Sequence, residues 1–591
     1  MNKGEHTLEK VKAKISPQHT LACLAAITLV SSSAWAQTPP NAGTLTNEQQ
    51  RLQAPALQRL QSQEEPEAIR PPMEEKAGVK VKVKGFRFTG IQGVATESEL
   101  NLVVRDAIGK EFGLGELRRL ADRITQHLKD NGWFLARAYL PRQEVKDGIV
   151  EIAVVAGRLD GEPKIKVISP HRIKVYTLEG LIRGNTSATP GQPLRNDSLE
   201  RGLLLANDLP GVSARSVLEP GSSPGTVKMQ VKATEGPLFS GSVWGDTYGN
   251  RYTGLGRANG LLQVNDPLSY GDQLSLMVTG AEGYTFGQGT YIAPLGNSGL
   301  KGYASYSEMR YTLDRDLLPL NYDGGARTFS AGLRYPLLRT RLKNLWITGD
   351  DTYRMLWDKT SDVKVSDKTV NIVSVSANGD MLDRWWGGGY STLNVGLGAG
   401  RLDLSGVASD LANDRITAHS DGSFSKATYA FSRLQKLYQR LNFFASLTGQ
   451  QAFDNLDSSE KFSLGGPSGV RAYPVGEATG DSGRILTCEL RYDLKPWATL
   501  GIPQVVAFYD AGWTELHNSP WANSGTALAN LNSYWLSGAG LGFNLTKDDL
   551  YDLRLAWATT LGNNPGRSLS GNDADGLSNN NRFWLQGQAH F

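Results

Sequence analysis

The sequence predicts a transmembrane antiparallel β-barrel preceded by two small α/β domains and an N-terminal helix. The chain begins with the pattern of an export signal, and after it no apolar stretch reaches the roughly 18 residues that a membrane-spanning helix needs. Two units with a similar order of elements follow the signal. From residue 236 onward, short alternating segments are separated by Gly, Asn, Asp and Pro, as in a barrel of many strands.

The composition fits this fold class but would also fit a soluble β-rich protein. The 591 residues include 66 Gly, and 9% are aromatic, which suits many strands and turns. Only 40% are hydrophobic, but a barrel keeps its mean hydropathy low because lipid-facing and lumen-facing residues alternate. The net charge of +3 gives no argument for a nucleic-acid partner.

Residues 1–36 are predicted to be a signal peptide. An apolar run, residues 21–30, leads to an Ala-Trp-Ala cleavage site that ends at Ala36, and the run is preceded by Lys10, Lys12 and Lys14. The run is too short to cross a bilayer as a helix, and the alternative interpretation is a buried helix. Cleavage would remove Cys23 and leave Cys488 as the only thiol, so no intramolecular disulfide is expected.

Residues 37–78 are interpreted as a helix followed by a linker. A Gln-rich stretch has helical potential because it carries Leu45, Leu52, Leu57 and Leu60. An extended chain is then favoured by Pro66, Pro71 and Pro72. The composition of this segment fits plain disorder equally well.

Residues 79–160 are predicted to form a β-α-α-β-β domain. Valines alternate with lysines over residues 79–84, which is typical of a strand with one solvated face. Thr96 and Glu99 form a potential capping box at the start of a helix. A second helix carries one apolar stripe, made of Leu117, Leu120, Ala121, Ile124 and Leu128. Two strands follow, at residues 136–140 and 149–155.

Residues 161–235 repeat this order loosely. Strands are predicted at residues 165–168, 212–218 and 227–231, and helices at residues 178–182 and 199–205. We expect the second of these helices to be capped by Asn196 or Asp197. Two similar units in tandem indicate a repeated domain.

Residues 236–591 are predicted to form the barrel. A transmembrane strand needs about 9–11 residues, so the length of this region allows roughly 14 to 18 strands. The last strand is the clearest, because apolar and polar side chains alternate up to Phe591, with Trp584 as an aromatic exception. A closing, lipid-facing strand typically ends in this way, and we interpret Phe591 as the assembly signal. The soluble alternative is the edge strand of a β-sandwich.

No catalytic or metal-binding pattern accompanies this organisation, and we expect neither enzyme activity nor a cofactor. Residues 480–483 (Gly-Asp-Ser-Gly) are similar to a protease nucleophile loop but have no supporting His context. Two glycine runs, 396–400 and 538–542, lack the spacing of nucleotide-binding loops. The histidines that follow the signal are not spaced as metal ligands: His127, His171, His419, His517 and His590.

Several stretches carry a family resemblance that covers nearly the whole mature chain. Residues 462–467 (Phe-Ser-Leu-Gly-Gly-Pro) lead into a loop motif similar to V-R-G-Y, formed by Val470, Arg471, Ala472, Tyr473 and Pro474. A strand motif similar to F-x-D-x-G is formed by Phe508, Asp510 and Gly512. Together with residues 209–221 and 245–254, these motifs resemble the two-partner secretion transporters (TpsB), also called the ShlB/FhaC/HecB haemolysin secretion/activation family.

The resemblance implies a barrel of 16 strands, two periplasmic POTRA (polypeptide-transport-associated) domains and an N-terminal helix that plugs the lumen. It also implies that the loop of Arg471 folds back inside the barrel and that Arg471 pairs with Asp510. A guanidinium can bind a carboxylate through two hydrogen bonds and so hold a long loop in one conformation. The residues alone would favour a solvated loop arginine and an ordinary turn aspartate. Ala472 departs from the family motif, which often has Gly there, and a positive φ would strain it.

The resemblance implies an outer-membrane pore that recognises an unfolded secreted protein of the TpsA type, such as an adhesin or haemolysin, and moves it out of the periplasm. The secreted protein would add a strand to a POTRA sheet edge. Outer-membrane lipid and the barrel-assembly machinery are the other expected partners, nucleic acid is not expected, and the chain is expected to be a monomer. The alternatives are a BamA-like assembly factor, which usually carries more POTRA domains, and a diffusive porin, which needs no such domains.

Overall fold

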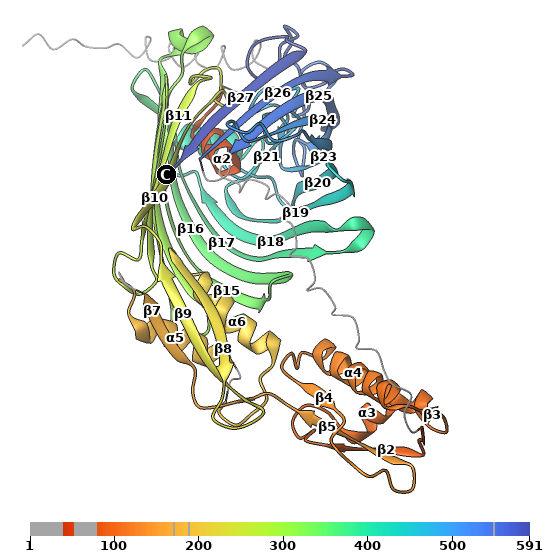
Figure 1. The fold of residues 1–591 in the computed structure, drawn as a ribbon. Coiled ribbons are helices and arrows are strands. Elements are labelled where there is room, and N and C mark those ends of the chain that lie inside the picture. The colour runs from red at the N-terminus through yellow and green to blue at the C-terminus, as the bar shows by residue number, and fades with distance from the viewer. Residues whose placement is uncertain (1–38, 53–79, 169–171, 187–188, 548–549) are drawn as a thin grey trace, which may run out of the picture.

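The computed structural model describes residues 39–52, 80–168, 172–186, 189–547 and 550–591. Its largest part is a closed barrel of 16 antiparallel strands, which confirms the predicted fold class. Figure 1 shows the barrel above two small domains, with helix α2 inside the barrel. The predicted signal peptide and most of the predicted linker lie outside the described residues.

The barrel strands follow one another in sequence order around the wall, and the last strand pairs with the first. They are β10 (Phe239–Asp246), β11 (Arg257–Asn265), β12 (Gln273–Ala281), β13 (Tyr284–Pro294), β14 (Lys301–Thr312), β15 (Tyr322–Arg339), β16 (Lys343–Thr360), β17 (Val363–Asp383), β18 (Gly389–Asp403), β19 (Gly422–Tyr438), β20 (Leu441–Ala452), β23 (Ser482–Asp493), β24 (Ile502–Glu515), β25 (Ser533–Lys547), β26 (Tyr551–Leu561) and β27 (Asn581–His590). Pairing is uneven, since β16 and β17 pair over eighteen positions whereas the closing pair, β10 and β27, pairs over five. Short helices lie in three of the connections: η2 (Arg315–Leu320), η3 (Trp385–Gly387) and α7 (Ala408–Asp414).

The barrel wall shows the alternation that the sequence predicted. On β27, Phe583 and Leu585 are 75% and 43% exposed, whereas Trp584 between them is 7% exposed and points into the lumen. Apolar side chains are exposed on other strands as well, among them Val243, Val278, Val375, Leu397 and Leu541. An apolar outer face with a polar lumen is the arrangement that lipid requires. Among the described residues, no helix is long and apolar enough to span a membrane.

The first domain packs two helices, α3 (Glu97–Val104) and α4 (Leu114–Asp130), on one small sheet. The sheet order is β2 (Gly85–Thr89), β5 (Ile149–Val155) and β4 (Arg137–Tyr139). A separate pair joins β1 (Val81–Lys82) to β3 (Glu111–Phe112). A 3₁₀ turn, η1 (Arg105–Ala107), follows α3. Thr96 caps α3 as predicted, accepting a hydrogen bond from the Glu99 backbone N–H at 3.3 Å. The reciprocal half of the predicted box is wrong, because the Glu99 carboxylate contacts His127 on α4 at 2.9 Å instead.

The second domain has the same pattern of pairing. Its central strand, β9 (Thr226–Glu235), lies parallel to β7 (Lys164–Ile168) and antiparallel to β8 (Val212–Pro220), just as β5 lies parallel to β2 and antiparallel to β4. A short strand, β6 (Arg158–Leu159), also pairs with β9, and the helices are α5 (Val175–Asn185) and α6 (Asn196–Asn207). The repeat predicted from the sequence is therefore present in the fold.

The predicted cap of α6 is wrong. The helix already begins at Asn196, so the capping position falls on Arg195, which forms no side-chain cap. Asp197 lies inside the first turn, where it pairs with Arg195 at 2.9 Å. An acidic side chain in the first turn still interacts favourably with the positive end of the helix dipole.

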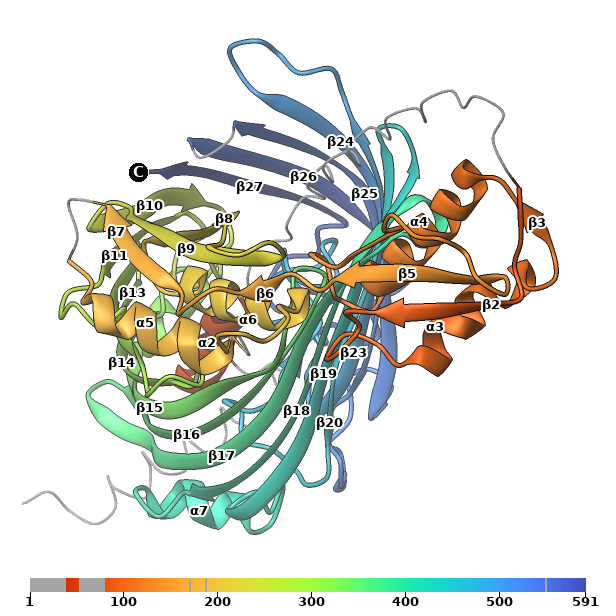
Figure 2. The same ribbon diagram turned by 60° about the horizontal axis from the view of Figure 1, so that its bottom comes forward.

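Contacts of both polar and aromatic side chains fix the second domain against the turns of the barrel. Arg339 at the end of β15 pairs with Asp208 at 2.7 Å, and Lys301 at the start of β14 donates to the Asp208 carbonyl at 2.6 Å. Lys174 lies 3.9 Å from the centre of the Tyr270 ring. Figure 2 shows this domain against the barrel, and the first domain, which precedes it in the chain, at the right of the view.

Candidate functional site

Residues 453–481, which connect β20 to β23, form a long loop that folds back into the lumen; we call it the inner loop. Within it, β21 (Phe462–Ser463) pairs with β22 (Thr479–Gly480). Leu464, Val470 and Tyr473 are almost fully buried and pack against side chains of the wall. The loop is therefore a packed part of the barrel interior.

Arg471 of this loop and Asp510 of β24 are in direct contact. The Arg471 Nε and Nη2 atoms each lie 2.8 Å from one oxygen of the Asp510 carboxylate, which is a two-point pairing. The backbone N–H of Arg471 also donates to Asp510, at 3.2 Å. Asp510 is completely buried, so its charge has no water to stabilise it and depends on these donors.

Three further residues complete this pair, and sequence reasoning missed them. Glu489 on β23 accepts a hydrogen bond from Arg471 Nη1 at 2.8 Å. Thr487 donates to Asp510 at 3.0 Å, and the indole of Trp584 donates to the Arg471 carbonyl at 2.8 Å. The sequence could have indicated Trp584, because a large aromatic side chain on the polar face of the last strand needs a partner in the lumen.

The remaining motif residues create the space for the loop. A side chain at Gly512 would meet Val470 at 3.0 Å, and one at Gly538 would meet the Ala472 methyl group at 2.4 Å. Ala472 is fully buried and does not adopt a positive φ, so the departure from Gly causes no backbone strain. Phe508 lies under the Arg471 guanidinium, 3.4 Å from its ring centre. Pro474 follows Tyr473 where the loop turns back toward β22.

A second set of ion pairs attaches the start of the inner loop to the opposite wall. Lys368 on β17 pairs with Asp457 at 2.6 Å, and Lys426 on β19 pairs with Glu460 at 2.8 Å. Arg354 on β16 also contacts Glu460. The loop thus bridges the lumen, with Arg471 on one wall and Glu460 on the other.

Helix α2 (Ala42–Leu52) lies between the inner loop and the wall formed by β14, β15 and β16. Asp358 on β16 holds its first turn, accepting from the Ala42 backbone N–H at 2.9 Å and from the Tyr311 hydroxyl at 2.6 Å. A carboxylate at the N-terminus of a helix satisfies free N–H groups and interacts favourably with the dipole. At the other end, Asn47 and Arg51 donate to backbone carbonyls of the inner loop.

One acidic side chain of α2, that of Glu48, is half-buried and forms no ion pair with the residues that the structure describes. Burial raises the pKa of Glu48 to about 8, although the nearby charges of Arg51 and Arg257 oppose this shift. Its carboxylate lies next to Gly476 of the inner loop, where an added side chain would meet it at 2.9 Å. Docking of α2 therefore places a protonated carboxyl group in the lumen near neutral pH.

Phe591 lies at the seam where the barrel closes. Its backbone N–H and carbonyl exchange hydrogen bonds with Gly241 at 3.0 and 2.9 Å, and its ring is 65% exposed.

Within the part of the chain that the structure describes, no group of His, Cys, Asp and Glu side chains is arranged to hold a metal ion.

Comparison with known proteins places the barrel and the first domain in one family. The family described as haemolysin secretion/activation protein ShlB/FhaC/HecB matches residues 225–545, and the ShlB-type POTRA domain matches residues 81–157. The heme/hemopexin transporter protein HuxB of Haemophilus influenzae is 28% identical over 499 residues, which cover 84% of each chain. The outer membrane transporter CdiB of Escherichia coli is 24% identical over 535 residues, which cover 88% of this chain and 87% of the relative.

Solved structures share the complete architecture. CdiB from Escherichia coli superposes with a TM-score of 0.67 at 20% identity, covering 98% of this chain and 100% of the other. CdiB from Acinetobacter baumannii gives a TM-score of 0.58 at 16% identity, with 97% and 98% coverage. At these identities the likeness establishes the fold. Since the family model itself spans more than half of the chain, the chain belongs to the haemolysin secretion/activation family of ShlB, FhaC and HecB, two-partner secretion transporters of the outer membrane with periplasmic POTRA domains.

Proposed function

We propose that this transporter binds one unfolded secreted protein in the periplasm and threads it through the barrel lumen. The observation that carries the proposal is the construction of the lumen, which is closed by an element separate from the wall. Helix α2 belongs to no strand or turn of the barrel, and it is held by hydrogen bonds that it donates to the wall and to the inner loop rather than by a continuous sheet. A plug of this kind can leave without disrupting the barrel.

The two small domains are proposed to receive the secreted protein. We assign residues 79–160 and 161–235 to two POTRA domains, residues 1–36 to a signal peptide, residues 37–78 to the plug and linker, and residues 236–591 to the barrel. Each domain leaves edge strands open on its sheet, among them β2 and β8. An extended polypeptide can add to such an edge through backbone hydrogen bonds.

The inner-loop motif (Val470, Arg471, Ala472, Tyr473 and Pro474) and its partner motif (Phe508, Asp510 and Gly512) are proposed to hold the loop during transport. Asp510 is fully buried, and Arg471 is its only cationic contact among the described residues. Because loss of one member of a buried ion pair leaves the other uncompensated, Arg471→Ala is expected to release the loop.

A secretion assay tests the proposed function. The transporter is expressed together with a candidate secreted protein, and the medium is probed for that protein. We expect release to require the transporter and to collapse for Arg471→Ala while heat-modifiable mobility on gels still reports a folded barrel. If the candidate protein stays in the periplasm and other outer-membrane barrels become depleted without this chain, an assembly function replaces the proposal.

We further propose that the chain works as a monomer and that the barrel-assembly machinery inserts it by recognising Phe591. The single chain closes its own barrel, and the Phe591 ring is exposed at the end of the last strand. Phe591→Ala is expected to lower the amount of folded barrel in the outer membrane without changing its secretion activity per molecule. An unchanged amount would contradict the assembly role, and native mass measurement in detergent tests the monomer.

A further inference from the structure

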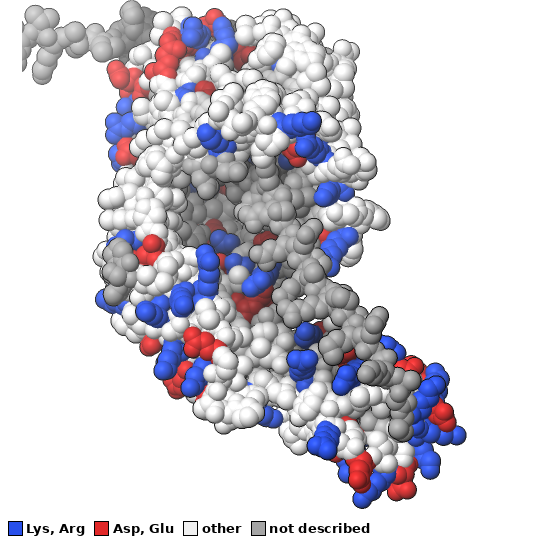
Figure 3. Space-filling view, viewed as in Figure 1, with Lys and Arg blue, Asp and Glu red and all other residues white. Residues whose placement is uncertain are grey.

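A cavity of about 1860 Å³ lies in the lumen between the inner loop and the end of the barrel that carries the two domains; we call it the vestibule. Turn residues such as Arg384 and Arg440 line its open end, and Arg471 and Trp584 line its inner end. Figure 3 shows that the molecule is hollowed on this side and that charged side chains lie around the hollow. Pockets for small ligands usually measure about 300–1000 Å³, so the vestibule has room for a polypeptide segment.

The acidic side chains of the vestibule already have partners. Ion pairs join Asp383 to Arg433, and Glu489 to Arg471 and Arg491. Asp552 lies 3.1 Å from a ring nitrogen of His590 and accepts a hydrogen bond from the Thr546 hydroxyl at 2.8 Å. Asp493 accepts hydrogen bonds from the side-chain amides of Gln504 and Asn442, at 2.7 and 3.3 Å. The wall therefore offers few free acceptors to a passing chain.

Several cationic side chains of the vestibule, in contrast to the acidic ones, have no partner in the described part of the chain. Within the described residues, four cations that line the vestibule have neither an ion pair nor a side-chain hydrogen bond: Arg384, Lys436, Arg440 and Arg554. Lys547 also lines the vestibule, but its ammonium group donates to the Thr499 carbonyl at 3.0 Å. The vestibule thus combines acidic side chains that already have partners with cationic side chains that have none among the described residues.

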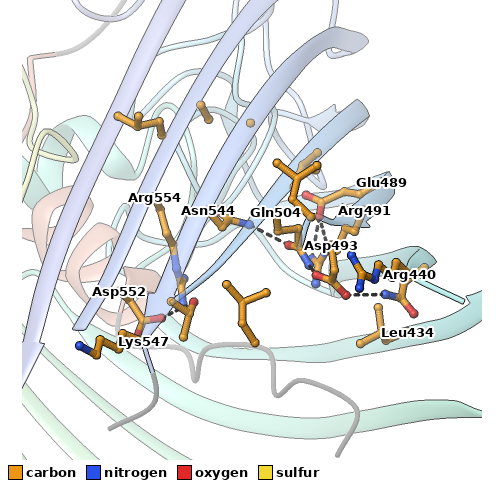
Figure 4. Close-up of a pocket in the computed structure, with 18 of the residues that line it drawn as sticks. Leu434, Arg440, Glu489, Arg491, Asp493, Gln504, Asn544, Lys547, Asp552 and Arg554 are labelled. Carbon is orange, nitrogen blue, oxygen red and sulfur yellow. Dashed lines mark hydrogen bonds and ion pairs between the residues drawn. The ribbon is translucent and has the colours of Figure 1, made fainter. Parts of the chain in front are cut away.

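Arg554 on β26 is the most informative of these cations because it is only partly exposed and lies inside the lumen. Figure 4 shows it beside Asn544, with Arg440 on the other side of the drawn cavity. The Asn544 amide donates to Gln504 at 3.0 Å, so this part of the wall is already bonded to itself. A guanidinium carries five donors and no acceptor, and partial burial without a partner is unfavourable.

We propose that the vestibule binds an acidic, extended segment of the secreted protein and that Arg554 selects acidic segments over basic ones. The inference rests on the proposed transport function and specifies the chemistry of its substrate. Carboxylates of Asp or Glu side chains would pair with Arg554 in the lumen and with Arg384, Lys436 and Arg440 at the rim. A basic segment would find only carboxylates that already accept hydrogen bonds within the wall, and it would meet the like charges of these four side chains.

The first test measures binding by the purified full-length mature chain in detergent. Fluorescein-labelled hexaglutamate and hexalysine peptides serve as probes, and fluorescence anisotropy reports binding. We expect hexaglutamate to bind more tightly, and its affinity to fall with added salt. Arg554→Glu should weaken hexaglutamate binding roughly tenfold, and Arg554→Lys should retain most of it.

The matched control is Arg401→Glu, which reverses an exposed arginine on β18 that lies outside the vestibule. It has the same change of net charge, so any general loss of attraction to anions appears in both variants. Equal binding of the two peptides would overturn the proposal. Equal hexaglutamate binding by the Arg554→Glu and Arg401→Glu variants would overturn it as well.

The secretion assay separates this inference from the function on which it rests. We expect Arg554→Glu to lower release of the secreted protein and Arg401→Glu to leave release unchanged, with both barrels folded. If release does not require the transporter at all, the proposed function fails. If release requires the transporter but the two variants secrete equally, only the role of the vestibule fails.

Discussion

The inner loop and helix α2 both fill the lumen, but they are held by different forces. The loop is covalently continuous with β20 and β23 and is fixed to two walls by buried ion pairs at Arg471 and Asp457. The helix buries mainly small or neutral residues, such as Ala42, Thr46 and Gln49, and is held by individual hydrogen bonds.

This difference indicates which of the two elements can move at the lower cost in free energy. Separating a buried ion pair exposes two charges that have lost their partners, which costs several kcal/mol. Removing α2 exchanges hydrogen bonds in the lumen for hydrogen bonds to water, at a net cost of about 1 kcal/mol each. We therefore expect the helix to leave first and the loop to stay as a fixed part of the channel.

The largest effect is expected when the fixed element is broken. Arg471→Asp leaves Asp510 buried without a cation and adds a like charge, so the loop should be destabilised by about 3–5 kcal/mol and secretion should fail. The double variant Arg471→Asp with Asp510→Arg should recover part of the secretion, because the pair is restored in reverse. Recovery will be incomplete because Glu489 then faces the new aspartate. A double variant no better than either single one would remove the support for this pairing.

A smaller effect is expected when the removable element is loosened. Asp358→Ala removes the acceptor of the Ala42 N–H and the Tyr311 hydroxyl, which should weaken docking of α2 by about 1–3 kcal/mol. Single-channel recording in planar bilayers should then show a larger open fraction. Asp351→Asn, at an exposed position of the same strand, is the control and should behave as wild type. An unchanged open fraction in Asp358→Ala would mean that contacts other than those of Asp358 keep α2 docked.

The helix should also respond to pH. The pKa of Glu48 is about 8 when α2 is docked and returns toward the ordinary value of 4.5 when the helix enters water. Docking is therefore favoured at low pH and weakens as pH rises between these two values, because only the released carboxyl loses its proton. We expect the open fraction to increase from pH 5 to pH 8 and the slope to vanish in Glu48→Gln. The charged groups that face Glu48 are Arg51 and Arg257, whose positive charges oppose the shift.

The smallest effect is expected from Trp584→Phe. The change removes one hydrogen bond to the Arg471 carbonyl and should lower the stability of the docked loop by about 1 kcal/mol. The temperature at which the barrel loses its heat-modifiable mobility should fall by a few degrees. Trp557→Phe alters a partly exposed tryptophan on β26 and serves as the control. Equal shifts in both variants would mean that the indole contributes only through its size.

Local patterns predicted the elements of this molecule well. The apolar stripe of α4 is buried in full, and the alternation of β27 distinguishes its lipid face from its lumen face. Such patterns report which face of an element is buried, because burial recurs with the period of the helix or strand. The predicted cap of α6 was misplaced by one or two residues, because a pattern of apolar residues fixes the ends of a helix poorly.

Contacts inside the lumen were beyond the reach of such patterns. Ala42 and Asp358 are 316 residues apart in the sequence, and nothing in the periodicity around either residue links them. The same is true of Trp584 and Arg471, which are 113 residues apart. The contact between Arg471 and Asp510 was expected only through the family resemblance, because the two residues alone look like ordinary loop and turn residues.

The uneven pairing around the barrel gives the wall a preferred line of rupture. The closing strands β10 and β27 share five paired positions, from Ser242 opposite His590 to Asp246 opposite Gln586, whereas β16 and β17 share eighteen. Under heat or force, the cylinder should unzip along this short seam while the long strands on the far side still hold together. Amide hydrogen exchange would detect it as early loss of protection at Val243 and Ala589, and uniform exchange around the ring would contradict it.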